Sequence, residues 1–241
     1  MSFTAADVMR KANTILQDAG AIRWTPVELR EWLNEGMRAI ITVKPNAKSG
    51  TVILELDNGT LQSLPPEYTI LSRIVCNVGA APASARGRAV RSLWRREILD
   101  SQIPGWQDPT VLPYSANVDM VLQDAMSPRE FYVVPGNNGS GRLEAVVGMY
   151  PAPIPLPPSG SLNLESYTTA VPMDDVYQGI LVDLVLFRAF SKDSAAQDAA
   201  ARAQAHLALA QGALQSFGTA EGSMSLANIY GMQMNPAGST Q

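Results

Sequence analysis

The side chains best suited to chemistry in this sequence are five arginines close together: Arg86, Arg88, Arg91, Arg95 and Arg96. A guanidinium group donates paired hydrogen bonds to carboxylates and phosphates, so the cluster could bind an acidic protein surface or a nucleic acid. A simpler interpretation is a solvated face that Glu97 and Asp100 partly neutralise. Because the net charge is -4 and DNA binding usually requires wider positive charge, we favour a protein–protein interface. Trp94 and Trp106 nearby are candidate core or interface anchors.

The sequence contains little else that could support catalysis or metal binding. His206 is the only histidine and Cys76 the only cysteine, which excludes an internal disulfide and a cysteine-rich zinc site. We expect His206 to lie on a helix surface or between helices, and Cys76 to be a small core residue. Helix capping explains Asp174 and Asp175 more simply than metal binding does. We therefore expect no catalytic residue, no cofactor, no metal and no enzyme activity.

Composition indicates a protein that covers part of its surface with partners. Hydrophobic residues make up 46% of the chain and charged residues only 17%, which is low for a monomer fully surrounded by water. No signal peptide and no apolar run of about 20 residues is apparent. We expect a soluble protein without a membrane anchor, synthesised in a cytoplasm.

Helical patterns occur at both ends of the chain. Residues 4–18 and 26–43 have helical apolar stripes, and Thr4 and Thr25 begin capping boxes. Near the C-terminus, a helix is predicted to begin after Asp174, and a second, capped by Asp193, is predicted to end at Gly218. The two C-terminal helices predict a packed hairpin.

Between the helices, the apolar residues alternate with a period of two, which is typical of strands. Strands are predicted over 51–56, 60–64, 70–78, 118–123, 131–134 and 143–150. The turn at 57–59 and the glycine-rich tip at 136–141 each predict a hairpin between the flanking strands. The proline-rich segment 151–158 is interpreted as a linker rather than as a ligand for a peptide-binding groove.

The predicted fold class is α+β: an antiparallel helical bundle, formed by the N- and C-terminal helix pairs, with an inserted small antiparallel β lobe. We divide the chain into an N-terminal helical pair (1–48), an inserted β-rich lobe (49–158), a linker with the C-terminal helical hairpin (159–217) and an extended tail (218–241). A polar tail of this kind is usually ordered only against a partner. Its candidate docking residues are Met224, Leu226, Ile229, Tyr230 and Met232.

Three stretches together resemble a known family. They are the N-terminal segments 12–18, 22–24 and 31–36, the segment 91–106, and the C-terminal segments 174–177, 181–183 and 188–193. This pattern, over about residues 8–217, resembles the head-to-tail adaptor (connector) proteins of short-tailed bacteriophages.

The resemblance implies a structural virion protein at the head–tail junction, assembled as a ring, typically of twelve copies. Its expected partners are copies of itself, the portal protein, a tail tube or nozzle protein, and DNA that passes through the channel without sequence-specific binding. We expect a neutral-to-acidic channel wall. The alternative is a regulatory or nucleic-acid-binding protein that uses the Arg86–Arg96 cluster; a tail hydrolase is disfavoured because a catalytic set is missing.

Overall fold

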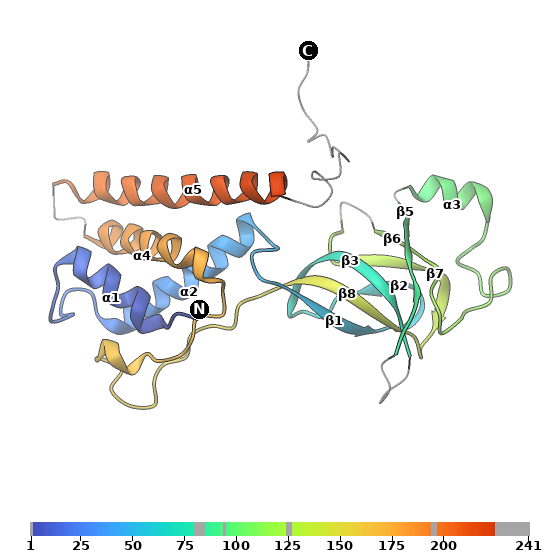
Figure 1. Ribbon diagram of the computed structural model, residues 1–241, viewed down its shortest axis with the longest axis horizontal. Helices are drawn as coiled ribbons and strands as arrows, with labels where there is room; N and C mark the ends of the chain where they lie inside the picture. Colours follow the sequence, from blue (N-terminus) through green and yellow to red (C-terminus); the bar gives the residue numbers. More distant parts are fainter. Residues whose placement is uncertain (1, 80–84, 94, 124–126, 194–196, 225–241) are drawn as a thin grey trace, which may run out of the picture. The chain divides into compact units, whose positions relative to one another are not determined.

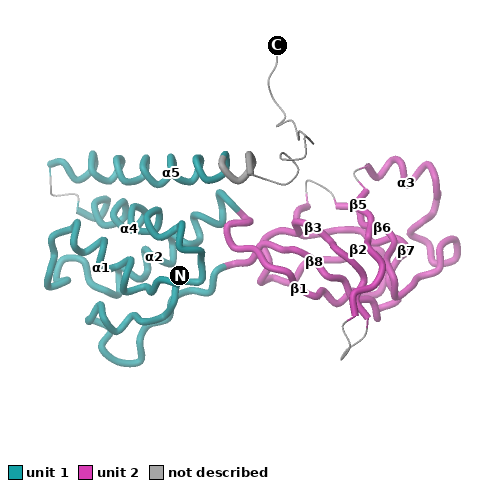
Figure 2. Tube along the Cα trace, viewed as in Figure 1, with its two compact units in different colours: residues 1–44, 151–241 teal, residues 45–150 magenta. Residues whose placement is uncertain are grey.

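The computed structural model describes residues 2–79, 85–93, 95–123, 127–193 and 197–224 (Figure 1), without the side chains of residues 220–224. The chain forms two compact units (Figure 2). The helical unit combines residues 1–44 with residues 151–241, and the β unit consists of residues 45–150.

The helical unit contains four long helices: α1 (Ala5–Leu16), α2 (Pro26–Val43), α4 (Gln178–Lys192) and α5 (Ala199–Met224). Helix α4 packs against α5, α2 and α1 (Figure 1). Because neighbours surround it, α4 is apolar on several sides, and its buried residues are Ile180, Leu181, Val182, Val185, Leu186, Ala189 and Phe190. This helix therefore organises the core of the unit.

Both N-terminal helices begin with the predicted capping boxes. The Thr4 hydroxyl accepts from the Asp7 amide at 3.3 Å, and the Asp7 carboxylate accepts from the Thr4 amide at 2.8 Å. Thr25 and Glu28 make the same reciprocal pair at 3.4 and 3.1 Å. Each box satisfies amides that the first helical turn leaves without partners.

The expected limits of the C-terminal helices are wrong in three places. Asp174 makes no side-chain cap, because a 3-10 turn (Asp175–Tyr177) precedes α4. Asp193 ends α4, and its buried carboxylate forms an ion pair with the exposed Arg23 instead of capping α5. Helix α5 continues through Gly218 to Met224, since a glycine inside a helix costs only about 1 kcal/mol.

The segment that returns from the β unit lies against the first two helices. Asn34 of α2 donates to the Ile154 carbonyl at 3.3 Å and accepts from the Ile154 amide at 2.8 Å. Further along, the amides of Ala5 and Ala6 donate to carbonyls of residues 169 and 167. A short 3-10 turn, Leu164–Ser166, lies between these contacts. The proline-rich segment is thus an anchored connection.

The described residues of the β unit form two four-stranded sheets. The first has the order β1 (Ser49–Glu55), β8 (Arg142–Met149), β3 (Tyr68–Val78) and β4 (Arg86–Ala89). The second has the order β2 (Asn58–Ser63), β7 (Glu130–Asn138), β6 (Met120–Gln123) and β5 (Arg91–Leu93). All described pairs are antiparallel except β5 with β6. Helix α3 (Arg96–Gln102) follows β5.

One apolar cluster joins the two sheets. Leu54, Ile74 and Val147 from the first sheet pack with Val121 and Phe131 from the second. Cys76 is 5% exposed and is the small core residue that the sequence predicts. The β unit therefore has a core of its own, formed between the faces of two sheets.

Two expectations about the β region are wrong. The bundle with a small β lobe is corrected to an α+β protein in which eight of the described strands form a substantial β unit. The two expected hairpins do not form either, because β1 and β2 enter different sheets, as do β7 and β8. Alternation shows which side chains face the core, but it does not show which strands pair.

A buried asparagine fixes one of these crossings between sheets. Asn137 is fully buried, donates to the Ser115 carbonyl at 3.0 Å, and accepts from the amides of Gly139 and Gly141 at 2.8 and 3.1 Å. A Cβ at Gly141 would lie 2.0 Å from the Asn137 side-chain nitrogen. The segment 136–141, expected to be a flexible hairpin tip, is instead a hydrogen-bonded crossing.

Candidate functional site

The five arginines of the predicted cluster lie on three consecutive elements of the β unit. Arg86 and Arg88 belong to β4, Arg91 to β5, and Arg95 and Arg96 to the start of α3. All five are exposed. The cluster therefore follows one edge of each sheet and continues onto the short helix.

The Arg86 side chain is held by hydrogen bonds within the β unit. Its guanidinium donates two hydrogen bonds, at 2.7 and 2.6 Å, to the carboxylate of Glu144 on β8, which also accepts from the Cys76 thiol at 3.3 Å. The Arg86 bonds, followed by the Cys76 bond, lower the pKa of Glu144 to about 2. Burial, followed by the bond to Glu144, raises the pKa of the Cys76 thiol. The thiol is therefore kept protonated and is unsuited to nucleophilic chemistry.

Arg88 and Arg96 are also paired. Arg88 donates to Asp119 at 3.0 Å on the surface. Arg96 lies 3.5 Å from Asp100, and its guanidinium carbon is 5.3 Å from the centroid of the Tyr132 ring. Exposed pairs of this kind stabilise a protein by about 1 kcal/mol or less.

Arg91 and Arg95 make no ion pair with any described residue, and neither does Glu97. The positive charge of the cluster is therefore partly neutralised, as expected: Asp100 pairs with Arg96, whereas Glu97 pairs with none of the described arginines. Two cations of the cluster therefore have no ion-pair partner among the described residues: Arg91 at the start of β5 and Arg95 at the start of α3. These are the arginines of the cluster that could bind a partner.

Trp106 serves as a core anchor. It is 2% exposed and packs with Leu99 and Val134. Its indole N–H donates to Asp100 at 2.8 Å, and the ring meets Tyr132 edge-on at 5.8 Å. Trp106 therefore fixes α3 and the loop after it onto the sheet; Trp94 lies outside the described residues.

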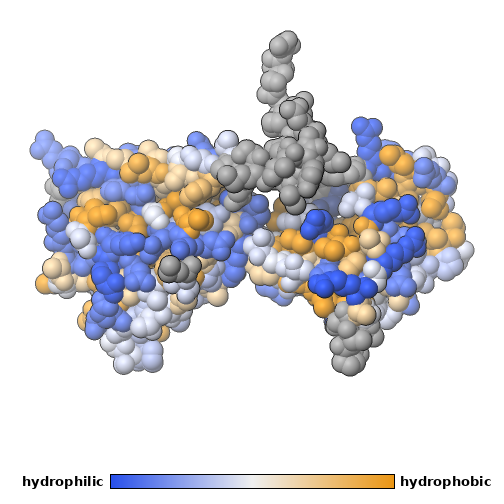
Figure 3. Space-filling view, viewed as in Figure 1, coloured by the Kyte–Doolittle hydropathy of each residue, from blue (hydrophilic) through white to orange (hydrophobic). Residues whose placement is uncertain are grey.

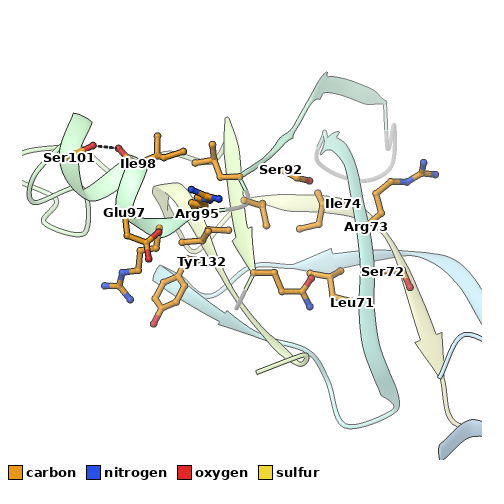
Figure 4. Close-up of a pocket in the computed structure, with 15 residues that line it drawn as sticks. Leu71, Ser72, Arg73, Ile74, Ser92, Arg95, Glu97, Ile98, Ser101 and Tyr132 are labelled. Atoms are coloured by element: carbon orange, nitrogen blue, oxygen red, sulfur yellow. Dashed lines mark hydrogen bonds between the residues drawn. The ribbon is translucent and has the colours of Figure 1, made fainter. Parts of the chain in front are cut away.

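A groove of about 1120 Å³ lies beside the free arginines. Figure 4 shows β3 contributing Leu71, Ser72, Arg73 and Ile74 on one side, with Glu97, Ile98 and Ser101 of α3 on the other. Strands β5, β6 and β7 supply the remaining lining, including Leu93, Val121, Leu122 and Tyr132. The groove thus combines an apolar lining with the charges of Arg73, Arg95, Arg96 and Glu97.

Arg73, Tyr132 and Glu144 were missed at the sequence level. The fold brings them to the arginines from strands distant in sequence, so no local spacing identifies them. Glu144 alone carries a signal, because it is a charged residue within the apolar run 143–147, and a buried carboxylate generally requires a cationic partner.

The helical unit contains the only histidine. His206 of α5 lies 2.9 Å from the Asp183 carboxylate and stacks on the Phe190 ring at 5.7 Å between centroids. This confirms the expectation of a helix-packing histidine. Leu226, Ile229, Tyr230 and Met232 lie outside the described residues; Met224 is in the last turn of α5, and its side chain is not described.

Within the described ranges, no three side chains of the His, Cys, Asp and Glu types come together as a metal site requires. Across the same residues, no helix combines the length and the apolar character that a bilayer crossing requires.

The comparisons with known proteins identify the family. The family model described as SU10 adaptor protein matches residues 3–230. A search of curated proteins finds no match. The matched range includes both units and most of the chain, and it confirms the resemblance to phage head-to-tail adaptors. The adaptors of this family are structural proteins and are not a class of enzymes. This chain therefore belongs to the SU10 adaptor protein family and is a structural adaptor of a bacteriophage.

Proposed function

We propose that copies of this chain form a closed ring that joins the capsid portal to the tail and surrounds the channel through which DNA passes. The observation that carries the proposal is the family match over residues 3–230. A ring of identical subunits uses two different patches of each subunit in a head-to-tail contact that closes on itself. The ring, with twelve copies, would be a virion component at the head–tail junction.

The helical unit supplies a surface suited to contacts between subunits. Helix α5 carries one full charge, Arg202, between Ala199 and Thr219. Ala205, Ala208 and Gly212 are exposed beside Leu209, which is 60% exposed. Small side chains allow another helix to approach closely. An exposed uncharged face of this kind gains little from contact with water and is suited to contact with another subunit.

Other apolar side chains of this unit are also exposed. Ile22, Val43 and Leu162 are 85%, 70% and 73% exposed, and orange patches interrupt the hydrophilic surface of the helical unit in Figure 3. Contact with neighbouring subunits or with the portal would remove this surface from water at about 25 cal/mol per Å². We assign the helical unit to contacts around the ring, the β unit to the next tail component, and residues 225–241 to docking on the portal or a neighbouring subunit.

The channel wall is proposed to be neutral to acidic, because a wall that bound DNA tightly would hinder its passage. The net charge of -4 per subunit supports this. Three of the five arginines in the cluster are paired with carboxylates, which reduces the positive charge that the cluster presents to phosphates.

Assembly on the portal tests the proposal. The purified full-length chain is mixed with portal rings and its mass followed by light scattering. We expect Leu209→Glu to weaken assembly at least tenfold, and Gln211→Glu, which adds the same charge to the same helix, to have little effect. Deleting residues 225–241 tests tail docking, since assembly without them would refute that role alone. No association by any variant, with salt-dependent DNA binding, would favour the nucleic-acid alternative.

A further inference from the structure

We infer that the groove between β3 and α3 binds an extended, acidic peptide segment of a partner protein, which aligns beside the edge strand β5. This inference goes beyond the adaptor ring, and it rests on the geometry and charge of the β unit alone. It assigns a role to the free arginines that the fold does not use.

The first support is the position of β5. Strand β5 is the last strand of its sheet, and among the described strands it pairs, in parallel, with β6 only. The Arg91 amide donates to the Asp119 carbonyl at 3.0 Å, on the β6 side. Neighbouring amides of a strand alternate in direction, so the Ser92 amide faces the open edge. An open edge is a template for an added strand.

The second support is the unbalanced charge. Arg73 and Arg95 line the groove, and neither forms an ion pair with a described residue. Arg91 adds a third free cation on the adjoining strand. Among the described residues that line the groove, Glu97 is the only acidic one. A ligand with carboxylates would therefore meet an excess of guanidinium groups, which bind carboxylates in a bidentate manner.

The third support is the size and apolar lining of the groove. At about 1120 Å³ it exceeds most small-molecule pockets, which measure about 300–1,000 Å³. Ile98 is 45% exposed, and Leu93 and Tyr132 are half-buried beside it. A strand that alternates acidic and apolar residues could direct one set to the arginines and the other to this lining. A nucleic acid would leave the open strand edge unused, because its backbone lacks the amide and carbonyl groups that extend a sheet.

Fluorescence anisotropy with a defined probe tests the inference. The probe is a labelled eight-residue peptide that alternates glutamate and valine, titrated with the full-length chain. Comparison probes are the lysine–valine peptide, the glutamate–valine peptide with methylated backbone amides, and a single-stranded oligothymidine. We expect saturable binding of the first probe only.

Variants locate the binding. Arg95→Glu should weaken binding of the glutamate–valine peptide at least tenfold. Arg38→Glu, at an exposed arginine of α2, should leave the binding affinity unchanged. Glu97→Gln should bind the peptide a few-fold more tightly, a gain that misfolding cannot produce. Unchanged circular dichroism spectra would show that the variants are folded.

Three results would overturn the inference: no saturable peptide binding, binding that Arg95→Glu leaves unchanged, or Arg95-dependent binding of the oligonucleotide only. Undiminished binding of the methylated peptide would refute the added strand. Assembly on the portal is measured separately, so failure of this inference and failure of the proposed ring give different results.

Discussion

Replacement of Asn137 by alanine should unfold the crossing between the two sheets. The fully buried side chain makes four hydrogen bonds, of 2.8–3.4 Å, to the backbone of residues 115, 116, 139 and 141. Four bonds at a net contribution of about 1 kcal/mol each, with an added cost of up to about 1 kcal/mol for the buried Gly141 amide left without this partner, give a destabilisation of about 4–5 kcal/mol. This is a large part of the total stability of a domain, about 5–15 kcal/mol.

Hydrogen exchange measured by mass spectrometry suits this prediction because the two units have separate cores. Amides of β3 and β8 should exchange roughly a thousandfold faster in Asn137→Ala, since each 1.4 kcal/mol corresponds to about a factor of ten. Amides of α4 should be unchanged and serve as an internal control. Asn138→Ala should have little effect, because the side chain of this exposed neighbour accepts hydrogen bonds from the amide and hydroxyl of Ser140 at the surface. An effect below about 1 kcal/mol, or equal effects of the two variants, would refute the reasoning.

Three further predictions concern the pH dependence, a close backbone contact and a helix cap. The pKa of Glu144 is lowered from 4.5 to about 2. The stability that the ionised carboxylate contributes is therefore complete above the unfolded pKa and is lost as pH falls through this window. Urea unfolding followed at pH 7 and pH 3 should show a loss of stability in the wild-type protein that Glu144→Gln lacks. Gly148→Ala should destabilise the β unit by about 2 kcal/mol or more, because the added Cβ would lie 2.4 Å from the Pro45 carbonyl oxygen; wild-type exchange rates in β8 would contradict this. Thr25→Ala should destabilise the helical unit by about 1 kcal/mol, measured by urea unfolding, because it removes half of the capping box.

Features that depend on neighbours in the sequence were predictable. The capping boxes at Thr4 and Thr25 are each defined by two residues three positions apart, and both form. The strand segments also follow from alternation, because the inward side chains of a half-buried strand must be apolar. Cys76 and His206 occupy the core and the helix interface as their surroundings suggest.

Features that depend on long-range pairing were not predictable in this way. A turn such as 57–59 is compatible with a hairpin, but it also suits a chain that leaves one sheet for the other, as it does here. The shared core decides which sheet each strand enters, because residues from both sheets must be buried together in it. Helix α5 passes Gly218 because a glycine weakens a helix without ending it.

The candidate site shows the same division. The arginine cluster is visible in the sequence, but which of its members are free is decided by Glu144, Asp119 and Asp100, the first two of which come from other segments. Arg73 and Tyr132 join the groove only through the packing of the strands. The candidate tail residues from Leu226 onward stay predictions, which assembly experiments can test.

Native mass spectrometry of portal rings mixed with excess full-length chain can show whether the chain forms a closed ring on the portal. We expect a portal complex heavier by about twelve times the 25.9 kDa chain mass, with no complexes carrying a single copy at saturation, because the ring closes on itself. A portal mass that does not increase, or one that increases by independent single copies, would contradict the adaptor ring.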